Sequence, residues 1–241
     1  MFETTLFFSK LAASLIMVNP VRGKIKKMRE NKGDEATDDF IYHFVEEWSQ
    51  KRLKDTGCNI FVHGLENIPD RNVLFVSNHQ SNLDFLLLLA ELKRPVGFIA
   101  KIELEKIPLL RDWMRLINCI FIDRDDMRQQ VQVILEGIKM LKEGKNLIVF
   151  PEGTRSQDGK MMDFKAGSFK LATKSKAPIV PLTINGTNSA LEGNNNRLRK
   201  CDIHLYVHKP VYIEDLTKEQ LTSLHEYVRE IVAKPLEDKN E

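Results

Sequence analysis

The sequence of 241 residues contains only three cysteines, and its charge is almost balanced. Cys58, Cys119 and Cys201 stand far apart in the chain, so they predict neither a disulfide framework nor a Cys-x-x-Cys metal site. Thiols of this kind are typical of a reducing, cytosolic compartment. Lys and Arg number 36 against 34 Asp and Glu, a formal charge of +2 that does not indicate nucleic-acid binding. We therefore expect no metal site, no disulfide and no nucleic-acid partner.

Long hydrophobic runs are also missing, which argues against a membrane-spanning helix, since such a helix needs about 20 apolar residues. The best candidate, Leu6–Val18, is interrupted by Lys10 and Ser14 and ends at Asn19-Pro20. It lacks the basic start and the cleavage pattern of a signal peptide. A basic run, Arg22–Arg29, follows it. Such a helix either lies in the headgroup layer of a membrane and attracts anionic lipid, or covers the protein core.

A second helix is predicted over Thr37–Lys54, after a turn at Asn31–Asp34. Its apolar side chains recur at spacings of one, three and four residues, which places them on one stripe. They are Phe40, Ile41, Phe44, Val45 and Trp48. We interpret residues 1–56 as a helical, membrane-associating appendage and residues 57–241 as the main domain.

From Cys58 onward, short β-branched runs alternate with helical patterns. This alternation predicts an α/β fold with a largely parallel central sheet flanked by helices. The expected strands are Asn59–His63, Val73–Ser77, Val96–Ala100, Ile117–Ile122, Leu147–Phe150, Ile179–Ile184 and Ile203–Val207. The expected helices are Asn82–Leu92, Met127–Leu141, Gly167–Lys174 and Lys218–Ala233. Three of these helices open with capping-box spacing, at Ser81, Asp126 and Thr217.

Two strand ends carry polar residues, and in parallel sheets the chemistry gathers at such ends. At the first, His79 leaves a strand and Asp84 falls in the first turn of the next helix. A turn between them can bring the carboxylate to one ring nitrogen and leave the other free to take a proton. The alternative is structural: Asp84 caps the helix and His79 bonds the loop backbone.

At the second strand end, an apolar run meets Pro151, Glu152 and Gly153, followed by Thr154 and Arg155. The backbone must turn sharply there and expose amides. The planar fork of an arginine suits a phosphate or a carboxylate. The same residues could equally form a plain surface turn with a solvated arginine.

Taken together, these two segments resemble the paired signatures of the glycerolipid acyltransferase superfamily. The quoted blocks are Asn78–Asp84 and Phe150–Ser156, with Ile120–Arg124 similar to the family's second block and Val180–Ile184 similar to its fourth. The resemblance is greatest to the 1-acylglycerol-3-phosphate acyltransferases and covers residues 58–215. Asn118 stands where the second block usually has glycine, and Leu182 where the fourth usually has valine.

The resemblance implies a direct acyl transfer. His79 is the expected general base and Asp84 the residue that fixes its tautomer. Lys101, Arg124, Glu152, Gly153, Thr154 and Arg155 are the expected substrate-binding residues. The expected donor is acyl-CoA or acyl-ACP, with no cofactor, because a thioester is already activated. Lysophosphatidic acid is the expected acceptor, and the cytoplasmic face of a membrane is the expected location, with the protein peripheral or monotopic there.

Other functions stay open from the residues alone. Within the same superfamily they are acylation of glycerol 3-phosphate at its first position and acylation of another lysophospholipid. A non-catalytic lipid-binding module would keep the apolar helix but would not need His79 beside Asp84. A hydrolase would need a nucleophile or metal motif, and the sequence offers neither.

Overall fold

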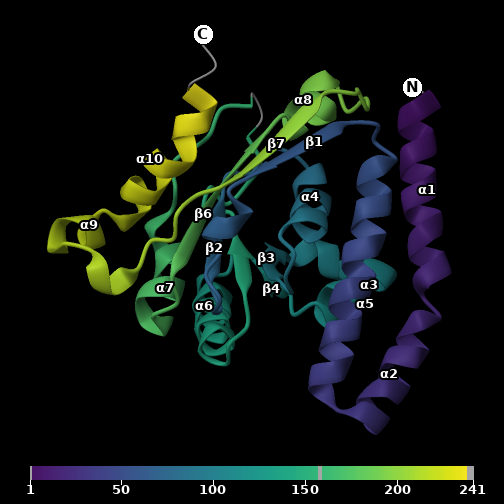
Figure 1. The fold of residues 1–241 in the computed structure, drawn as a ribbon, viewed down its shortest axis with the longest axis horizontal. Coiled ribbons are helices and arrows are strands. Elements are labelled where there is room, and N and C mark those ends of the chain that lie inside the picture. The colour runs from purple at the N-terminus through teal and green to yellow at the C-terminus, as the bar shows by residue number, and fades with distance from the viewer. Residues whose placement is uncertain (1, 157–158, 238–241) are drawn as a thin grey trace.

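The computed structural model describes residues 2–156 and 159–237, which form a three-layer α/β arrangement around one seven-stranded sheet (Figure 1). The strand order is β1-β7-β6-β2-β5-β3-β4. Five neighbouring pairs are parallel, and the β6–β7 pair is antiparallel. The predicted α/β class with a largely parallel sheet is therefore confirmed. The strands are β1 (Asn59–His63), β2 (Leu74–Ser77), β3 (Gly97–Lys101), β4 (Ile120–Ile122), β5 (Leu147–Val149), β6 (Ile179–Asn185) and β7 (Asp202–Val207).

Helices cover both faces of the sheet, because its central strands are apolar on both sides. Phe75 of β2 faces a core shared with α4 (Leu83–Glu91), whereas its neighbours Leu74 and Val76 face a second core. That second core is closed by α6 (Met127–Lys142), α7 (Lys170–Ser175) and α10 (Leu224–Glu237). This alternation explains why β2 is buried along its whole length.

The amino-terminal helices pack beside α4. They are α1 (Phe2–Val18), α2 (Val21–Lys32) and α3 (Asp34–Lys54), and Figure 1 shows α1 and α3 side by side. The Nε1–H of Trp48 donates to Ser14 Oγ at 3.1 Å, and Lys10 pairs with Asp55 at 3.6 Å, so polar contacts join α1 to α3. The helix α3 begins three residues earlier than predicted, because Gly33 alone makes the turn. The boundary near residue 56 falls between α3 and β1, and its meaning as a domain boundary stays a prediction.

The helical stretch at the amino terminus is longer than the sequence patterns indicated. Phe2–Lys32 forms a helical stretch of 31 residues that is long and apolar enough, by length and composition, to cross a membrane. Only 6% of its most apolar window is buried inside the protein, which is unlike the core helix of a globular domain. The expectation that no segment is long and apolar enough was therefore wrong; a two-residue turn at Asn19-Pro20 separates the apolar α1 from the polar α2 within this stretch.

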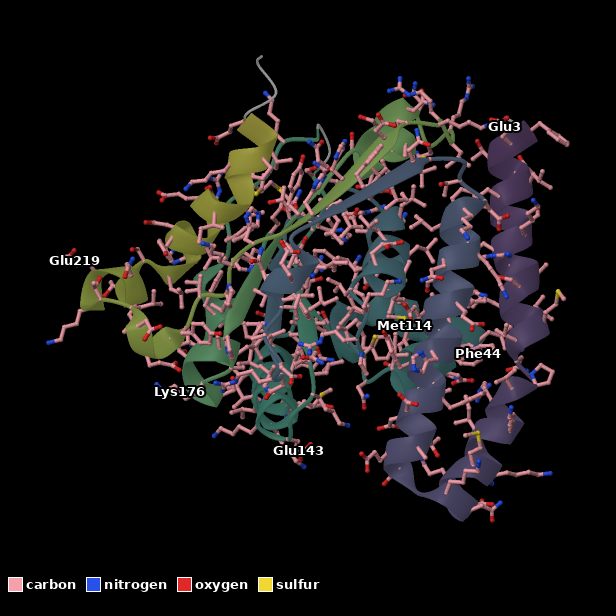
Figure 2. All side chains as sticks on the ribbon, in the orientation of Figure 1. Glu3, Phe44, Met114, Glu143, Lys176 and Glu219 are labelled. Atoms are coloured by element: carbon pink, nitrogen blue, oxygen red, sulfur yellow. The ribbon has the colours of Figure 1, made fainter. Side chains whose placement is uncertain are left out.

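A helix that was not predicted precedes β4. α5 (Pro108–Leu116) occupies the segment before β4, and its Trp113 stacks on Phe44 of α3 with ring centroids 5.3 Å apart. Figure 2 shows Phe44 and Met114 close to this meeting of α3 and α5. The predicted strand at Ile117–Ile122 is shorter than expected, since residues 117–119 close α5 and β4 begins at Ile120.

The departure at Asn118 has a conformational explanation. Asn118 has a φ of 60°, in the left-handed region that glycine and asparagine tolerate best. Its carbonyl oxygen would lie 2.3 Å from a Cβ on Gly97, so glycine at position 97 allows the two segments to meet. Asparagine therefore serves at a position where the resembling family usually has glycine.

The helix predicted over Lys218–Ala233 is two helices. α9 (Lys218–Thr222) ends at Ser223, and α10 begins at Leu224. The capping box at Thr217 and Gln220 is confirmed in full. At Asp126 only half of the box forms, because the side chain of Gln129 accepts from the amide of Asp123 instead.

Candidate active site

The two signature segments meet because their strands are neighbours. Val76 of β2 and Val149 of β5 are paired in parallel register, so both strands end at the same edge of the sheet. His79 follows one strand end and Glu152 follows the other. The adjacent β6 ends at this edge as well, which adds the loop that follows it. Side chains far apart in the sequence therefore converge here, as expected for an open parallel sheet.

His79 and Asp84 form a buried hydrogen-bonded pair. His79 Nδ1 lies 2.7 Å from Asp84 Oδ2, and the same oxygen accepts the backbone N–H groups of Gln80 at 2.7 Å and Ser81 at 2.9 Å. Because Oδ2 serves as an acceptor for the two amides, we assign the proton of the imidazole to Nδ1. Nε2 is then left as the ring nitrogen with a lone pair. The predicted contact is thus confirmed, and Asp84 also organises the start of α4.

Aromatic rings hold the imidazole from two sides. Phe150 stacks on it with centroids 4.1 Å apart and an interplanar angle of 18°, and Phe85 meets it edge-on at 5.7 Å. Asn78, the residue before His79, donates a hydrogen bond to the carbonyl of Ile184 and accepts one from its N–H, each at 2.8 Å. These bonds fix the end of β2 to β6. The His79 residue is 8% exposed. These contacts restrict the ring to one orientation.

Glu152 binds the backbone of the site. Its Oε1 accepts from the amide of His79 at 2.7 Å, and its Oε2 accepts from the amide of Met162 at 2.9 Å. Burial raises the pKa of Glu152 above its ordinary value, although the two backbone hydrogen bonds act in the opposite direction. These contacts place both its oxygens on the loops that carry His79 and Met162, and substrate binding by Glu152 stays a prediction.

Gly153 and Thr154 form the turn that follows. Gly153 has a φ of 78°, and a Cβ at this position would lie 2.8 Å from Lys165 Nζ. Thr154 is exposed at the turn. The amide of Gly153 donates to Phe150 O at 3.0 Å, while those of His79 and Gln80 donate to the carboxylates described above. All three amides therefore donate to acceptors within the protein itself.

Arg155 is directed toward the start of α4 by a residue that sequence patterns did not identify. Its Nη1 donates to Glu192 Oε1 at 2.7 Å. Glu192 begins the short 3-10 helix Glu192–Asn194, which follows α8 (Thr187–Ala190) in the loop after β6. One signal was available: Glu192 is the sole acidic residue between Gly186 and Lys200, in a loop that also carries Arg197 and Arg199.

Lys101 ends β3, and Arg124 lies two residues after the end of β4, at the same edge of the sheet. Lys101 is exposed and pairs with Glu103 at 2.6 Å. Burial lowers the pKa of Arg124, and the nearby carboxylate of Glu103 opposes this shift. Among the described residues, no hydrogen bond or ion pair connects either side chain to the His79–Arg155 group.

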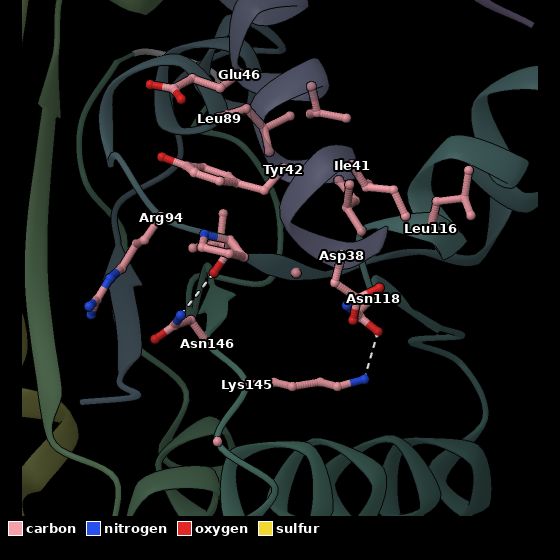
Figure 3. A pocket seen from close by; sticks show the side chains of 16 residues that line it. Asp38, Ile41, Tyr42, Glu46, Leu89, Arg94, Leu116, Asn118, Lys145 and Asn146 are labelled. Atoms are coloured by element: carbon pink, nitrogen blue, oxygen red, sulfur yellow. Dashed lines mark hydrogen bonds between the residues drawn. The ribbon is translucent and has the colours of Figure 1, made fainter. Parts of the chain in front are cut away.

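A separate cavity of about 220 Å³ lies at the other edge of the sheet, between α3 and the beginnings of β3 and β5 (Figure 3). In it, Lys145 Nζ donates to Asn118 Oδ1 at 2.9 Å. The described residues that line this cavity include none of the predicted site residues. The described residues also contain no group of three His, Cys, Asp or Glu side chains placed to hold a metal ion.

Comparisons with known proteins agree with this geometry. Residues 59–185, just over half of the chain, match the model of the Acyltransferase family. The 1-acyl-sn-glycerol-3-phosphate acyltransferase BAT2 of Brassica napus chloroplasts is 38% identical over 154 residues, which are 63% of this chain and 44% of that protein. The 1-acyl-sn-glycerol-3-phosphate acyltransferase of Borreliella burgdorferi is 31% identical over 182 residues, covering 75% of this chain and 73% of that protein.

A solved structure extends the similarity to nearly the whole fold. The crystal structure of the 1-acyl-sn-glycerophosphate acyltransferase PlsC from Thermotoga maritima aligns with a TM-score of 0.82 and 31% identity, over 98% of this chain and 96% of that one. The chain spans about half of the length of several longer relatives, including the chloroplast protein of Brassica napus. The matched domain and these relatives show that the chain belongs to the 1-acylglycerol-3-phosphate acyltransferase family of the glycerolipid acyltransferases.

Proposed function

We propose that the protein transfers a fatty acyl group from acyl-CoA or acyl-ACP to the sn-2 hydroxyl of 1-acyl-glycerol 3-phosphate, giving phosphatidic acid. One observation carries the proposal: the buried His79–Asp84 pair lies at the same sheet edge as Arg155. A base that accepts a proton and a guanidinium that binds a phosphate are the two groups that this acceptor needs. The relatives named above, called 1-acyl-sn-glycerol-3-phosphate acyltransferases, support the same acceptor.

The chemistry begins with the acceptor hydroxyl, which is a poor nucleophile at neutral pH. His79 Nε2 removes its proton while the oxygen attacks the thioester carbonyl. The tetrahedral intermediate then collapses, the C–S bond breaks, and the imidazolium returns the proton to the leaving thiolate. Base catalysis of this kind contributes about 10²–10⁴-fold to a rate. Asp84 keeps Nδ1 protonated and stabilises the imidazolium as it forms.

The phosphate of the acceptor is bound by Arg155 in this scheme. The contact to Glu192 occupies one of the five N–H donors of its guanidinium. Arg124 and Lys101 lie at the ends of neighbouring strands at the same edge and add positive charge beside the site. A planar guanidinium with several donors suits a tetrahedral phosphate better than a single ammonium group does.

The acceptor is a lipid, so the protein must meet a membrane. The helix α1 has exposed apolar side chains at Phe2, Ile16 and Met17, which are 79%, 63% and 79% exposed. The basic helix α2 follows with Lys24, Lys26 and Lys27. An apolar helix followed by basic residues binds the anionic cytoplasmic face of a bilayer, as a peripheral or monotopic protein does.

A direct assay tests the proposed reaction. Purified protein is given labelled acyl-CoA or acyl-ACP and one of three acceptors: lysophosphatidic acid, glycerol 3-phosphate or lysophosphatidylcholine. We expect the highest kcat/KM with lysophosphatidic acid and a product acylated at sn-2. A higher kcat/KM with either other acceptor would contradict the proposed acceptor. The absence of transfer to all three, with a folded protein on liposomes, would favour a lipid-binding module.

A further inference from the structure

Glu192 receives hydrogen bonds from three donors around the start of α4. Its Oε1 accepts from Arg155 Nη1 at 2.7 Å and from the amide of Asn82 at 2.9 Å. Its Oε2 accepts from Ser81 Oγ. The Glu192 side chain is 17% exposed, whereas that of Arg155 is 41% exposed, so the carboxylate is the more enclosed partner. Glu192 therefore connects three segments: its own loop, the start of α4 and the turn after β5.

The same short segment of backbone is held by a second carboxylate. Asp84 accepts the amides of Gln80 and Ser81, and Glu192 accepts the next amide, that of Asn82. Asp84 also orients the imidazole of His79, as described above. The catalytic imidazole and the guanidinium are thus both positioned against residues 80–82. A shift of one group relative to that segment would change its distance from the other.

We propose that Glu192 is a positioning residue that holds Arg155 at the distance from His79 which the phosphorylated acceptor requires. The proposal rests on the proposed function, because it takes Arg155 as the phosphate ligand. A guanidinium held by a carboxylate in one rotamer loses less conformational entropy when a phosphate binds. The hydroxyl of the acceptor is then delivered to His79 Nε2 from a fixed phosphate. Such alignment contributes strongly to rate, since a displacement of about 1 Å can cost about a hundredfold.

The experiment is a double-mutant cycle on selectivity. Wild type, Glu192→Ala, Arg155→Ala and the double variant are assayed with acyl-CoA and two acceptors, lysophosphatidic acid and the matching monoacylglycerol, which lacks the phosphate. Glu192→Ala should lower kcat/KM for lysophosphatidic acid about tenfold to a hundredfold, in line with the loss of a charge-assisted contact. Its kcat/KM for monoacylglycerol should stay within about twofold of wild type. In the double variant, the loss should equal that of Arg155→Ala alone.

The conservative variant Glu192→Gln separates positioning from charge. Its Oε1 can still accept from Arg155 and Asn82, and its Nε2–H can donate to the Ser81 hydroxyl, which accepts as well as donates. We expect at least about a third of the wild-type kcat/KM for lysophosphatidic acid. The control is Glu143→Gln, which removes an exposed carboxylate at the end of α6. Thermal unfolding of every variant reports on the fold, and Glu192→Gln supplies the test if Glu192→Ala does not fold.

Two failures can be told apart. If Arg155→Ala removes the preference for the phosphorylated acceptor while Glu192→Ala keeps it, Glu192 is not a positioning residue and the proposed function stands. Equal losses with both acceptors, or additive losses in the double variant, would show a purely structural role for Glu192. If Arg155→Ala itself keeps the preference, the phosphate-binding role of Arg155 falls, and the role of Glu192 falls with it.

Discussion

Phe150 stacks on His79 with an interplanar angle of 18° and a centroid separation of 4.1 Å. The ring comes from the last apolar position before the turn that carries Glu152 and Arg155. The end of β5 thus packs against the imidazole of His79 as well as presenting the turn that carries Arg155. Contact between these neighbouring strand ends makes the orientation of the imidazole depend on both signature segments.

Replacement of the proposed base tests the chemistry most directly. We expect His79→Ala to lower kcat about a thousandfold, within the usual contribution of a general base. Far-ultraviolet circular dichroism should show an unchanged fold, and the matched control His63→Ala, on the exposed side of β1, should leave kcat unchanged. A folded His79→Ala protein with more than a tenth of wild-type activity would refute the base role.

Arg155→Ala should act mainly on the acceptor. Loss of hydrogen bonds to a charged group costs about 1.5–3 kcal/mol, which corresponds to a rise in the acceptor KM of about tenfold to a hundredfold. Arg155→Lys should recover part of this loss, because lysine keeps the charge but not the planar fork. Steady-state kinetics at saturating donor measure both variants. An unchanged KM for lysophosphatidic acid would contradict phosphate binding by Arg155.

Glu152 should make stability depend on pH. Its pKa is raised in the folded protein above the ordinary 4.5, chiefly by burial, so between these values the folded state binds more protons than the unfolded chain. The stabilisation that Glu152 contributes is therefore fully present below its pKa in the unfolded chain. It is lost as the pH rises through its raised pKa in the folded protein. Glu152→Gln removes this titrating group. It should also lower the free energy of unfolding by about 1 kcal/mol, because the amide nitrogen of glutamine cannot accept a backbone hydrogen bond as a carboxylate oxygen does.

Urea unfolding at several pH values measures this effect. The free energy of unfolding of wild type minus that of Glu152→Gln should decrease as the pH is raised above about 4.5. Glu143→Gln provides the baseline for removing an exposed carboxylate. A difference that stays constant, or that grows with pH, would be inconsistent with the raised pKa.

The membrane role of α1 predicts a surface effect. Ile16→Glu/Met17→Glu places two charges at exposed positions, so we expect the fold to remain. Sedimentation with anionic liposomes should fall at least about tenfold, because burying charge in lipid is costly. Gln132→Glu/Lys142→Gln on the exposed face of α6 makes the same change in net charge and should sediment as wild type does. Equal sedimentation of all three proteins would disprove attachment through α1.

The fold was predictable where local patterns and tertiary packing agree. β2 and β5 are short apolar runs bounded by turn residues, and the structure places them within one residue of the predicted ends. α5 was missed because its burial depends on Trp113 meeting α3, a contact between segments about seventy residues apart. The strand before Asp123 was predicted too long because a positive φ at Asn118 cannot be read from hydrophobicity.

The candidate site was likewise predictable only in part. The contact between His79 and Asp84 was predictable, since only a four-residue turn separates them and the acid falls in the first helical turn. The backbone-binding role of Glu152 was less accessible, as it depends on the amide of Met162 ten residues later. The contacts of Glu192 were missed, because its partners lie 37 and 110 residues away and meet it only when β6 pairs with β2.

The amide of Leu198 donates to Thr4 Oγ1 at 2.9 Å, so the first turn of α1 is tied to the loop beyond Glu192. Figure 1 shows this end of α1 on the same side of the molecule as α8. If α1 binds a bilayer as proposed above, this bond would hold the loop that carries Arg197 and Arg199 at a set height relative to the helix. In that arrangement α1 would also set how far the carboxyl ends of the strands lie from the lipid surface.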